Sequence, residues 1–137
     1  MRETMRKNRP GYKFIAYHLP VIIFAAAIIS VSSIPYMQAP KFKLIAIDKL
    51  GHFLEYSIFA FLTFRSFSNI SAAIKGNLAY LLSLLFLGLF AILDEYYQSF
   101  IPGRFSDTAD LIVDMCGSFL VVTFFWLRHR RLKESTD

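Results

Sequence analysis

The sequence has very little cysteine: Cys116 is the only one in 137 residues. An internal disulfide is therefore impossible, and a zinc site built from several cysteines is excluded. Charge is also scarce, at 18% of residues, and the basic residues are not interleaved with a nucleic-acid recognition element. We therefore expect no nucleic-acid partner. What the sequence has in excess is apolar residues, which make up 55% of the chain, against roughly 45–50% in a soluble domain.

The apolar residues gather in four segments. They cover about residues 14–35, 48–67, 77–97 and 107–127. A helix rises ~1.5 Å per residue, so ~20 residues cross the ~30 Å hydrocarbon core of a bilayer. The sequence therefore predicts an all-α bundle of four transmembrane helices in a single domain, residues 1–137. The first segment also resembles a signal peptide, but we expect it to be retained.

Charge is distributed unequally between the ends of these segments. Eleven of the 15 basic residues fall in the two terminal tails and in the connection 65–75, whereas seven of the ten acidic residues lie at the opposite ends. Basic residues beside membrane spans mark the cytoplasmic side. We therefore predict a multi-pass protein of the plasma membrane with both termini in the cytoplasm and the acidic residues near the outer face.

Polar side chains interrupt three of the segments at this predicted outer end. Residues three, four or seven positions apart share a face of a helix. A carboxylate about 10 Å inside the membrane costs several kcal/mol unless it meets water or a partner. We therefore predict that the three polar faces converge on one functional cavity. They consist of Asp48, His52 and Glu55 on the second segment; Asp94, Glu95 and Gln98 on the third; and Asp107, Asp110 and Asp114 on the fourth.

A purely structural role remains open for several of these residues. Asp48 and Asp107 lie at helix starts, where an acid caps the helix and meets the positive end of its dipole. Asp94 and Glu95 lie near a helix end, where the dipole disfavours negative charge, so capping does not account for them. Arg104 is either a membrane anchor or a counter-ion of the site.

Two motifs in these regions resemble those of a known family. Residues 48–56 are similar to D-K-x-x-H-F-x-x-Y. Residues 94–106 are similar to D-E-x-x-Q-x-F-x-P-G-R-x-S, and Asp110, Asp114 and Gly117 continue that pattern. The chain thus resembles the VanZ-like family, named for a teicoplanin-resistance protein of bacteria, and the resemblance implies a bacterial integral membrane protein of the cell envelope. Glu55 and Asp114 depart from the usual residues of the family by adding negative charge.

The leading hypothesis is that the cavity recognises the polar headgroup of an envelope lipid or lipid-linked cell-wall precursor. Such binding would affect susceptibility to glycopeptide antibiotics. Arg104 would take a phosphate bidentately and Lys49 would add a charge, while carboxylates would accept sugar and peptide donors or hold Mg²⁺ or Ca²⁺. The candidate metal ligands are Asp94, Glu95 and Asp110. The candidate binding residues are Asp48, Lys49, Asp94, Gln98, Arg104, Ser106 and Asp114.

Two other hypotheses stay open. The first is an intramembrane enzyme that modifies such a lipid, with His52, Glu95 or Asp110 as general acid or base. The second is movement of an ion or proton, which is less favoured because the acidic residues stop half way across the membrane. The sequence does not indicate an oligomeric state.

Overall fold

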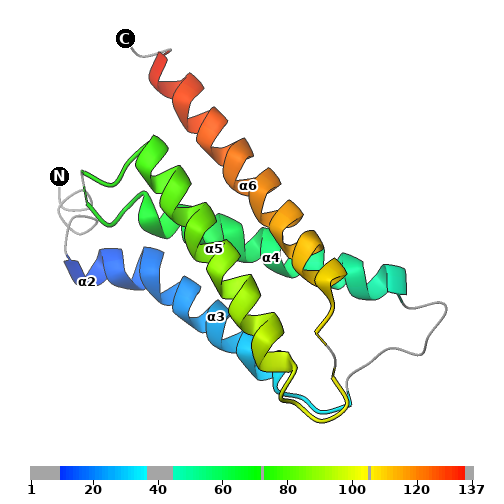
Figure 1. The fold of residues 1–137 in the computed structure, drawn as a ribbon. Helices are drawn as coiled ribbons and strands as arrows, with labels where there is room; N and C mark the ends of the chain where they lie inside the picture. The colour runs from blue at the N-terminus through cyan, green and yellow to red at the C-terminus, as the bar shows by residue number, and fades with distance from the viewer. Residues whose placement is uncertain (1–9, 37–44, 72, 105, 135–137) are drawn as a thin grey trace.

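A computed structural model of the chain describes residues 10–36, 45–71, 73–104 and 106–134. These residues form helices joined by turns, with no strand among them (Figure 1). The elements in chain order are α2 (Pro10–Lys13), the π-helical turn η1 (Phe14–His18), α3 (Leu19–Ser32), α4 (Ile45–Phe67), α5 (Asn77–Gln98) and α6 (Thr108–Glu134). The first three follow one another without a break, so the chain has four long helical segments. The predicted all-α class is confirmed.

Three of the four segments are long and apolar enough to cross a membrane. They are Gly11–Ser32, Asn77–Gln98 and Thr108–Leu132. Large apolar side chains on them point outward, among them Ile22, Leu85 and Phe119, each more than half exposed. Such surface suits a lipid environment. The chain is therefore a multi-pass membrane protein, as predicted.

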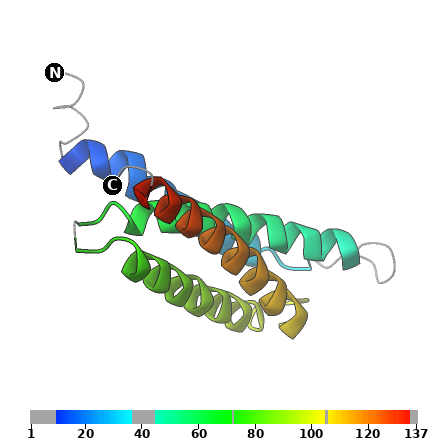
Figure 2. The same cartoon turned by 90° about the horizontal axis from the view of Figure 1, so that it is seen from above.

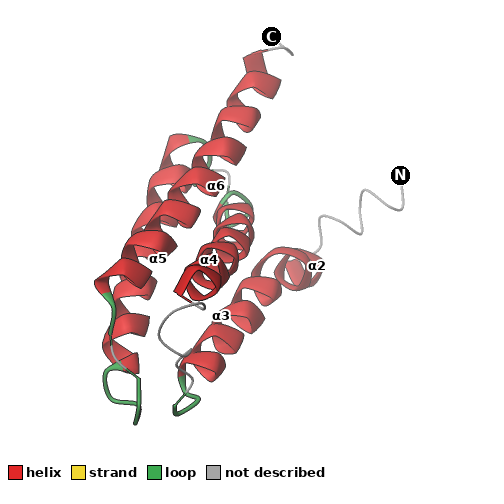
Figure 3. Ribbon diagram, turned by 90° about the vertical axis from the view of Figure 1, so that its right-hand side faces the viewer, coloured by secondary structure: helices red, strands yellow, loops and turns green. Residues whose placement is uncertain are grey.

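Helix α4, which corresponds to the second predicted span, is not among these three candidates. It is 23 residues long, but its first half carries Asp48, Lys49, His52 and Glu55, which lower its mean hydropathy. Its position explains this composition, because α4 packs against α3, α5 and α6. Figure 3 shows it between α3 on one side and α5 and α6 on the other, and Figure 2 shows α6 crossing it. A central helix meets protein on several sides and tolerates polar residues that a lipid-facing helix does not.

The helix ends differ modestly from the predicted spans. Helix α6 continues beyond residue 127 to Glu134, through Arg128, Arg130 and Arg131. Arginine is a good helix former, so nothing in this stretch stops the helix where its apolar part ends. Lys41, Lys43 and most of the predicted basic N-terminal tail lie outside the described residues. The cytoplasmic location of the termini stays a prediction.

The core of the bundle forms around one aromatic residue of α4. Phe59 is fully buried, and its ring lies 4.9 Å from that of Phe90 and 6.0 Å from that of Phe24, measured between centroids. Small residues, Ala60 on α4 and Ala79 on α5, are also fully buried. Small side chains allow helices in a membrane to approach closely, and packing rather than water exclusion then holds them together.

Helices α4 and α6 lie in close contact at Gly117. A Cβ atom at this position would lie 2.8 Å from the backbone oxygen of Phe53 and 3.0 Å from Oγ of Ser57. No side chain fits there without moving one of the helices. Gly117 therefore sets the distance between α4 and the face of α6 that carries Asp110 and Asp114.

The turn after α3 is joined to the loop between α5 and α6. The N–H of Tyr36 donates to the carbonyl of Pro102 at 3.1 Å, and the two turns lie side by side in Figure 1. Gly103 has a φ of +76°, and a Cβ there would lie 2.3 Å from the Tyr36 ring. Glycine is therefore required at residue 103 for both its backbone conformation and the contact with Tyr36.

Candidate functional site

A cavity of about 280 Å³ lies where α3 ends, α4 begins and α5 ends. Its walls combine apolar groups with six polar residues that the sequence singled out, from α4, α5 and the loop after α5, and with Ser32 of α3. The polar faces of α4 and α5 thus meet at this cavity, whereas no residue of α6 lines it; Asp110 and Asp114 lie beside it, against Lys49 and His52. The lining residues are Val31, Ser32, Ile47, Asp48, Gly51, His52, Glu55, Asp94, Gln98 and Arg104.

Lys49 joins α4 to the start of α6. Its Nζ donates to Oδ2 of Asp107 at 2.6 Å and also to Oδ1 of Asp110. Both carboxylates therefore compete with any external anion for the lysine. We predicted that Lys49 would offer its charge to a phosphate, but in the structure Lys49 is already paired with two carboxylates.

Asp107 lies just before α6, outside the apolar span that begins at Thr108. The hydrogen bond from Lys49 and that from the N–H of Ala109, at 2.8 Å, lower the pKa of the Asp107 carboxyl below its usual 3.8. Asp107 therefore combines two roles, because it caps the helix, as one alternative held, and also pairs with α4.

His52 lies between two carboxylates of α6. Its Nδ1 is 3.1 Å from Oδ1 of Asp114, and its Nε2 is 3.9 Å from Oδ2 of Asp110. Asp114 is almost fully buried and His52 is partly buried. A carboxylate bonded to one ring nitrogen orients an imidazole and fixes which nitrogen carries the proton. The second ring nitrogen, Nε2, is directed toward Asp110, and the ring lines the cavity.

Gln98 connects three elements through its side-chain amide. Its Nε2 donates to Oδ2 of Asp94 at 3.1 Å and to Oγ of Ser32 at 3.2 Å, and its Oε1 accepts from Nη2 of Arg104 at 2.9 Å. Nη1 of Arg104 donates to the carbonyl of Val31 at 3.1 Å. Arg104 thus closes the loop over the end of α3 with two of its five N–H groups and lines the cavity with the rest of the guanidinium.

Buried oxygens of two carboxylates have no hydrogen-bond donor among the described residues. They are Oδ1 of Asp94 and Oε1 of Glu95, in side chains that are 3% and 5% exposed. The other Glu95 oxygen accepts from the N–H of Asp107 at 2.9 Å, and exposed Ser106 lies beside the same carboxyl. An unpaired buried carboxylate oxygen is expensive, which points to a further donor or cation in the working protein.

The balance of charge in the site is strongly negative. Seven carboxyl groups lie in the cavity or beside it, together with two permanent cations and one imidazole. The site therefore favours cations and hydrogen-bond donors over a bare anion. The acids are Asp48, Glu55, Asp94, Glu95, Asp107, Asp110 and Asp114, and the basic groups are Lys49, Arg104 and His52.

Two groups of side chains could hold a divalent cation. In each, the three potential ligand atoms lie within 4.8 Å of one another; the groups are Asp48, His52 and Asp110, and His52, Glu95 and Asp114. Both contain His52, so the histidine lies between two potential cation positions. Glu95 and Asp110, which the sequence suggested as ligands, fall in different groups, and Asp94 falls in neither.

Sequence reasoning missed two members of the site. Ser32 belongs to neither sequence motif, but it is buried and its Oγ accepts a hydrogen bond from Nε2 of Gln98. Tyr56 is fully buried, and its hydroxyl finds no partner among the described residues although carboxylates surround it, including Asp94 and Asp114. The signal for Tyr56 was its place at the end of the first motif, one residue after Glu55.

His18 and His129 lie away from this cavity, as expected. His18 Nδ1 is 2.7 Å from Oγ of Ser66, near the last turn of α4. His129 lies near the end of α6. Only His52 of the three histidines contributes to the site.

Comparison with known proteins agrees with this arrangement. Searches of curated proteins and of solved structures find no significant match. A family model described as VanZ/LLP1 matches residues 3–129, a range that contains every site residue described above and all of the helical segments except the end of α6 after residue 129. The resemblance carried by the motifs around His52 and Arg104 is thereby confirmed, and the chain belongs to the VanZ/LLP1 family.

Proposed function

We propose that this membrane protein binds the polar headgroup of an envelope lipid or lipid-linked cell-wall precursor in the cavity beside His52. We further propose that it does so in the bacterial cytoplasmic membrane, with the basic ends of its helices inside and the cavity facing outward. The excess of basic residues at the opposite end of the bundle supports this orientation.

The observation that carries the proposal is the pair of unbonded carboxylate oxygens, Asp94 Oδ1 and Glu95 Oε1. A buried carboxyl oxygen without a hydrogen-bond partner costs about 1–3 kcal/mol, and folded proteins keep such groups mainly at functional sites. Hydroxyl and amine groups of a sugar, peptide or amine headgroup are donors of the kind that these oxygens lack.

The size and walls of the cavity also suit a headgroup. A volume of about 280 Å³ is at the small end for ligand pockets, which are typically about 300–1,000 Å³. Val31 and Ile47 provide apolar surface beside the polar groups, and Ile47 is 62% exposed. The cavity thus accommodates the polar end of an amphiphile while its chains remain in the membrane.

A phosphate in the ligand would be held by Arg104 and by a cation. Arg104 retains N–H groups beyond the two that bond Val31 and Gln98, and guanidinium binds phosphate bidentately. The surrounding carboxylates repel a bare phosphate, so a divalent cation would supply the missing positive charge. Mg²⁺ or Ca²⁺, which take oxygen ligands, would be held by the carboxylates of Glu95 and Asp114 beside His52.

The test is the lipid retained by purified protein, measured by native mass spectrometry after extraction from bacterial membranes. Asp94→Asn keeps the shape of the side chain and the acceptor for Gln98 but removes the negative charge, so retention is expected to fall. Asp107→Asn is the matched control, because it makes the same chemical change outside the cavity. Equal retention of lipid by the unmodified protein, Asp94→Asn and Asp107→Asn would refute the proposal. In cells, Asp94→Asn is expected to change glycopeptide susceptibility and Asp107→Asn is not.

A second candidate function is an enzyme that modifies the bound lipid. The specific observation in its favour is His52, held by Asp114 and close to Glu95, which is a geometry suited to general acid–base catalysis or to activation of a metal-bound water. Glu95→Gln would then abolish product formation from candidate lipids while the lipid still binds. Binding that persists without product in the unmodified protein would support recognition alone.

A further inference from the structure

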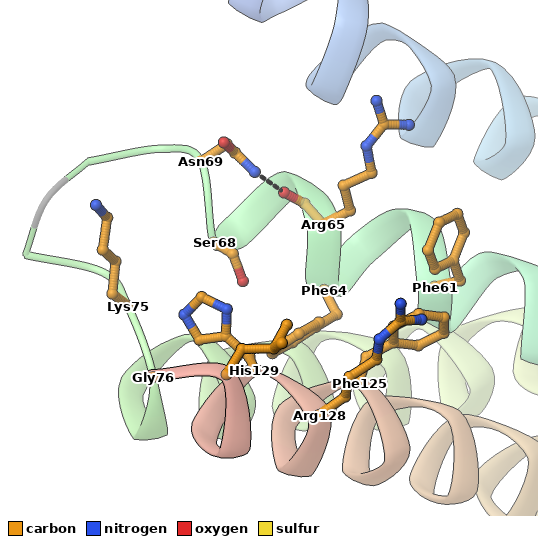
Figure 4. A pocket seen from close by; sticks show the side chains of 11 residues that line it. Phe61, Phe64, Arg65, Ser68, Asn69, Lys75, Gly76, Phe125, Arg128 and His129 are labelled. Carbon is orange, nitrogen blue, oxygen red and sulfur yellow. Dashed lines mark hydrogen bonds between the residues drawn. The ribbon is translucent and has the colours of Figure 1, made fainter. Parts of the chain in front are cut away.

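A second cavity lies at the opposite, basic end of the bundle. Its volume is about 540 Å³, and it lies between the last turns of α4, the start of α5 and the end of α6 (Figure 4). Among the residues that the structure describes, no aspartate or glutamate lines it. The lining residues are Phe61, Phe64, Arg65, Ser68, Asn69, Lys75, Gly76, Phe125, Arg128, His129 and Leu132.

Positive side chains reach this cavity from two different elements. Lys75 comes from the turn before α5, and Arg128 and His129 come from α6; Figure 4 shows Lys75 and Arg128 on either side of His129. The ion pairs recorded among the described residues all lie at the other end of the molecule, so none neutralises Lys75 or Arg128. Three polar or charged side chains are thus available to an anion.

Two neighbouring arginines are used differently. The guanidinium of Arg65 lies over the Tyr17 ring, 4.8 Å from its centroid, and Figure 4 shows it turned away from Arg128. Arg130 lies over the Trp126 ring at 5.1 Å. Both are held by cation–π contacts, so Lys75 and Arg128 are the two lining cations without a recorded partner among the described residues.

The floor of the cavity is aromatic. Phe64 is 8% exposed, and the rings of Phe61 and Phe125 lie 4.9 Å apart between centroids. Next to this floor, Phe124 and Leu127 of α6 are 60% and 44% exposed. Apolar surface therefore continues from the cavity onto the outside of the span Thr108–Leu132.

We propose that this cavity binds an anionic phospholipid, with the phosphate between Lys75 and Arg128 and the acyl chains along Phe125 and the outer face of α6. A phosphate alone would use the cations but not the aromatic floor. The cavity lies where an apolar span ends, which is the depth of lipid headgroups. Ser68 and Asn69 add hydrogen-bonding groups for glycerol oxygens. Basic pockets between membrane helices bind anionic headgroups by this combination of charge and apolar surface.

The experiment compares lipid binding by the full chain in vesicles of phosphatidylcholine with and without phosphatidylglycerol. A cation in contact with a bound anionic headgroup contributes about a fivefold factor to lipid binding, so Lys75→Gln with Arg128→Gln is expected to lower the preference for phosphatidylglycerol about 30-fold. Arg130→Gln with Arg131→Gln removes the same charge from the neighbouring helix surface and is expected to change it only about twofold, through the screened surface potential.

Three outcomes are decisive. A large loss in the first pair alone, restored by Lys75→Arg with Arg128→Lys, supports the site. Equal loss in both pairs would show that surface charge alone attracts the lipid and would overturn the proposal. Displacement of the lipid by millimolar inorganic phosphate would show a free-phosphate site instead, and would overturn the assignment to a lipid. All four positions are exposed, so these substitutions leave the folded core intact.

Discussion

Replacing Gly117 with alanine tests whether the contact between α4 and α6 sets the geometry of the acidic site. The added Cβ would lie 2.8 Å from the Phe53 carbonyl oxygen, whereas ordinary carbon–oxygen contacts between elements are about 3.3–3.6 Å. The oxygen belongs to the backbone of α4 and cannot rotate away. The helices must therefore separate by about 0.5–0.8 Å.

The cost follows from two effects that outweigh a smaller gain. Overpacking costs about 1–3 kcal/mol. The His52–Asp114 contact, 3.1 Å in the structure, would lengthen beyond good hydrogen-bond geometry, at about 1 kcal/mol. Alanine recovers about 1 kcal/mol of helix propensity. The expected net destabilisation is about 1–3 kcal/mol.

Gly88→Ala provides the matched control. The nearest atom to a Cβ at Gly88 is Cε of Met115 at 3.9 Å, which is an ordinary contact. The same substitution should therefore stabilise the protein by about 0.5–1 kcal/mol. Denaturant or thermal unfolding in detergent measures both variants. If Gly117→Ala is as stable as Gly88→Ala, the close approach of α4 to α6 is refuted.

Three further predictions concern the pH dependence, the core and the topology. The Asp107 carboxyl has a lowered pKa in the folded protein, so its contribution to stability is complete above its usual pKa of 3.8 and is lost as the pH falls below that value. Because Asp107 in the Lys49–Asp107 pair is half exposed, we expect a loss of about 1 kcal/mol or less in the free energy of unfolding. Unfolding measured between about pH 6 and about pH 3 tests this, and the loss should be absent in Asp107→Asn. Phe59→Ala should lower the free energy of unfolding by about 3–5 kcal/mol, because the ring is fully buried among other aromatic rings; an unchanged melting temperature would contradict this. In a Cys116→Ala background, a membrane-impermeant thiol reagent should label Thr108→Cys but not Ser71→Cys in intact cells, and the reverse pattern would invert the proposed orientation.

Several features of the molecule followed from the sequence without any knowledge of packing. Runs of apolar residues have only one stable solution in a membrane, a helix with its backbone groups bonded internally, so the all-α class and three of the spans were predictable. The periodicity of the charged residues also put Asp94 with Gln98, which do hydrogen-bond across one turn. Family membership followed from the two motifs.

Tertiary structure alone decided how the charged residues pair. Lys49 binds Asp107 and Asp110, and His52 binds Asp114, because Gly117 lets α6 lie against α4. A single helical face indicates which residues are neighbours along one helix but carries no information on the rotation of the next helix.

Because the sequence does not specify how the helices are rotated against one another, two features of the structure could not be predicted from it. Serine at the end of an apolar segment is unremarkable, so Ser32 could not be recognised as a partner of Gln98 before α3 was placed against α5. The basic cavity around Lys75 and Arg128 was likewise seen in the sequence only as charge that marks one side of the membrane. The sequence by itself determined the helices and the end of the bundle at which each charge lies. Only the packing of helices around α4 decided which charges neutralise one another and which remain free for a ligand.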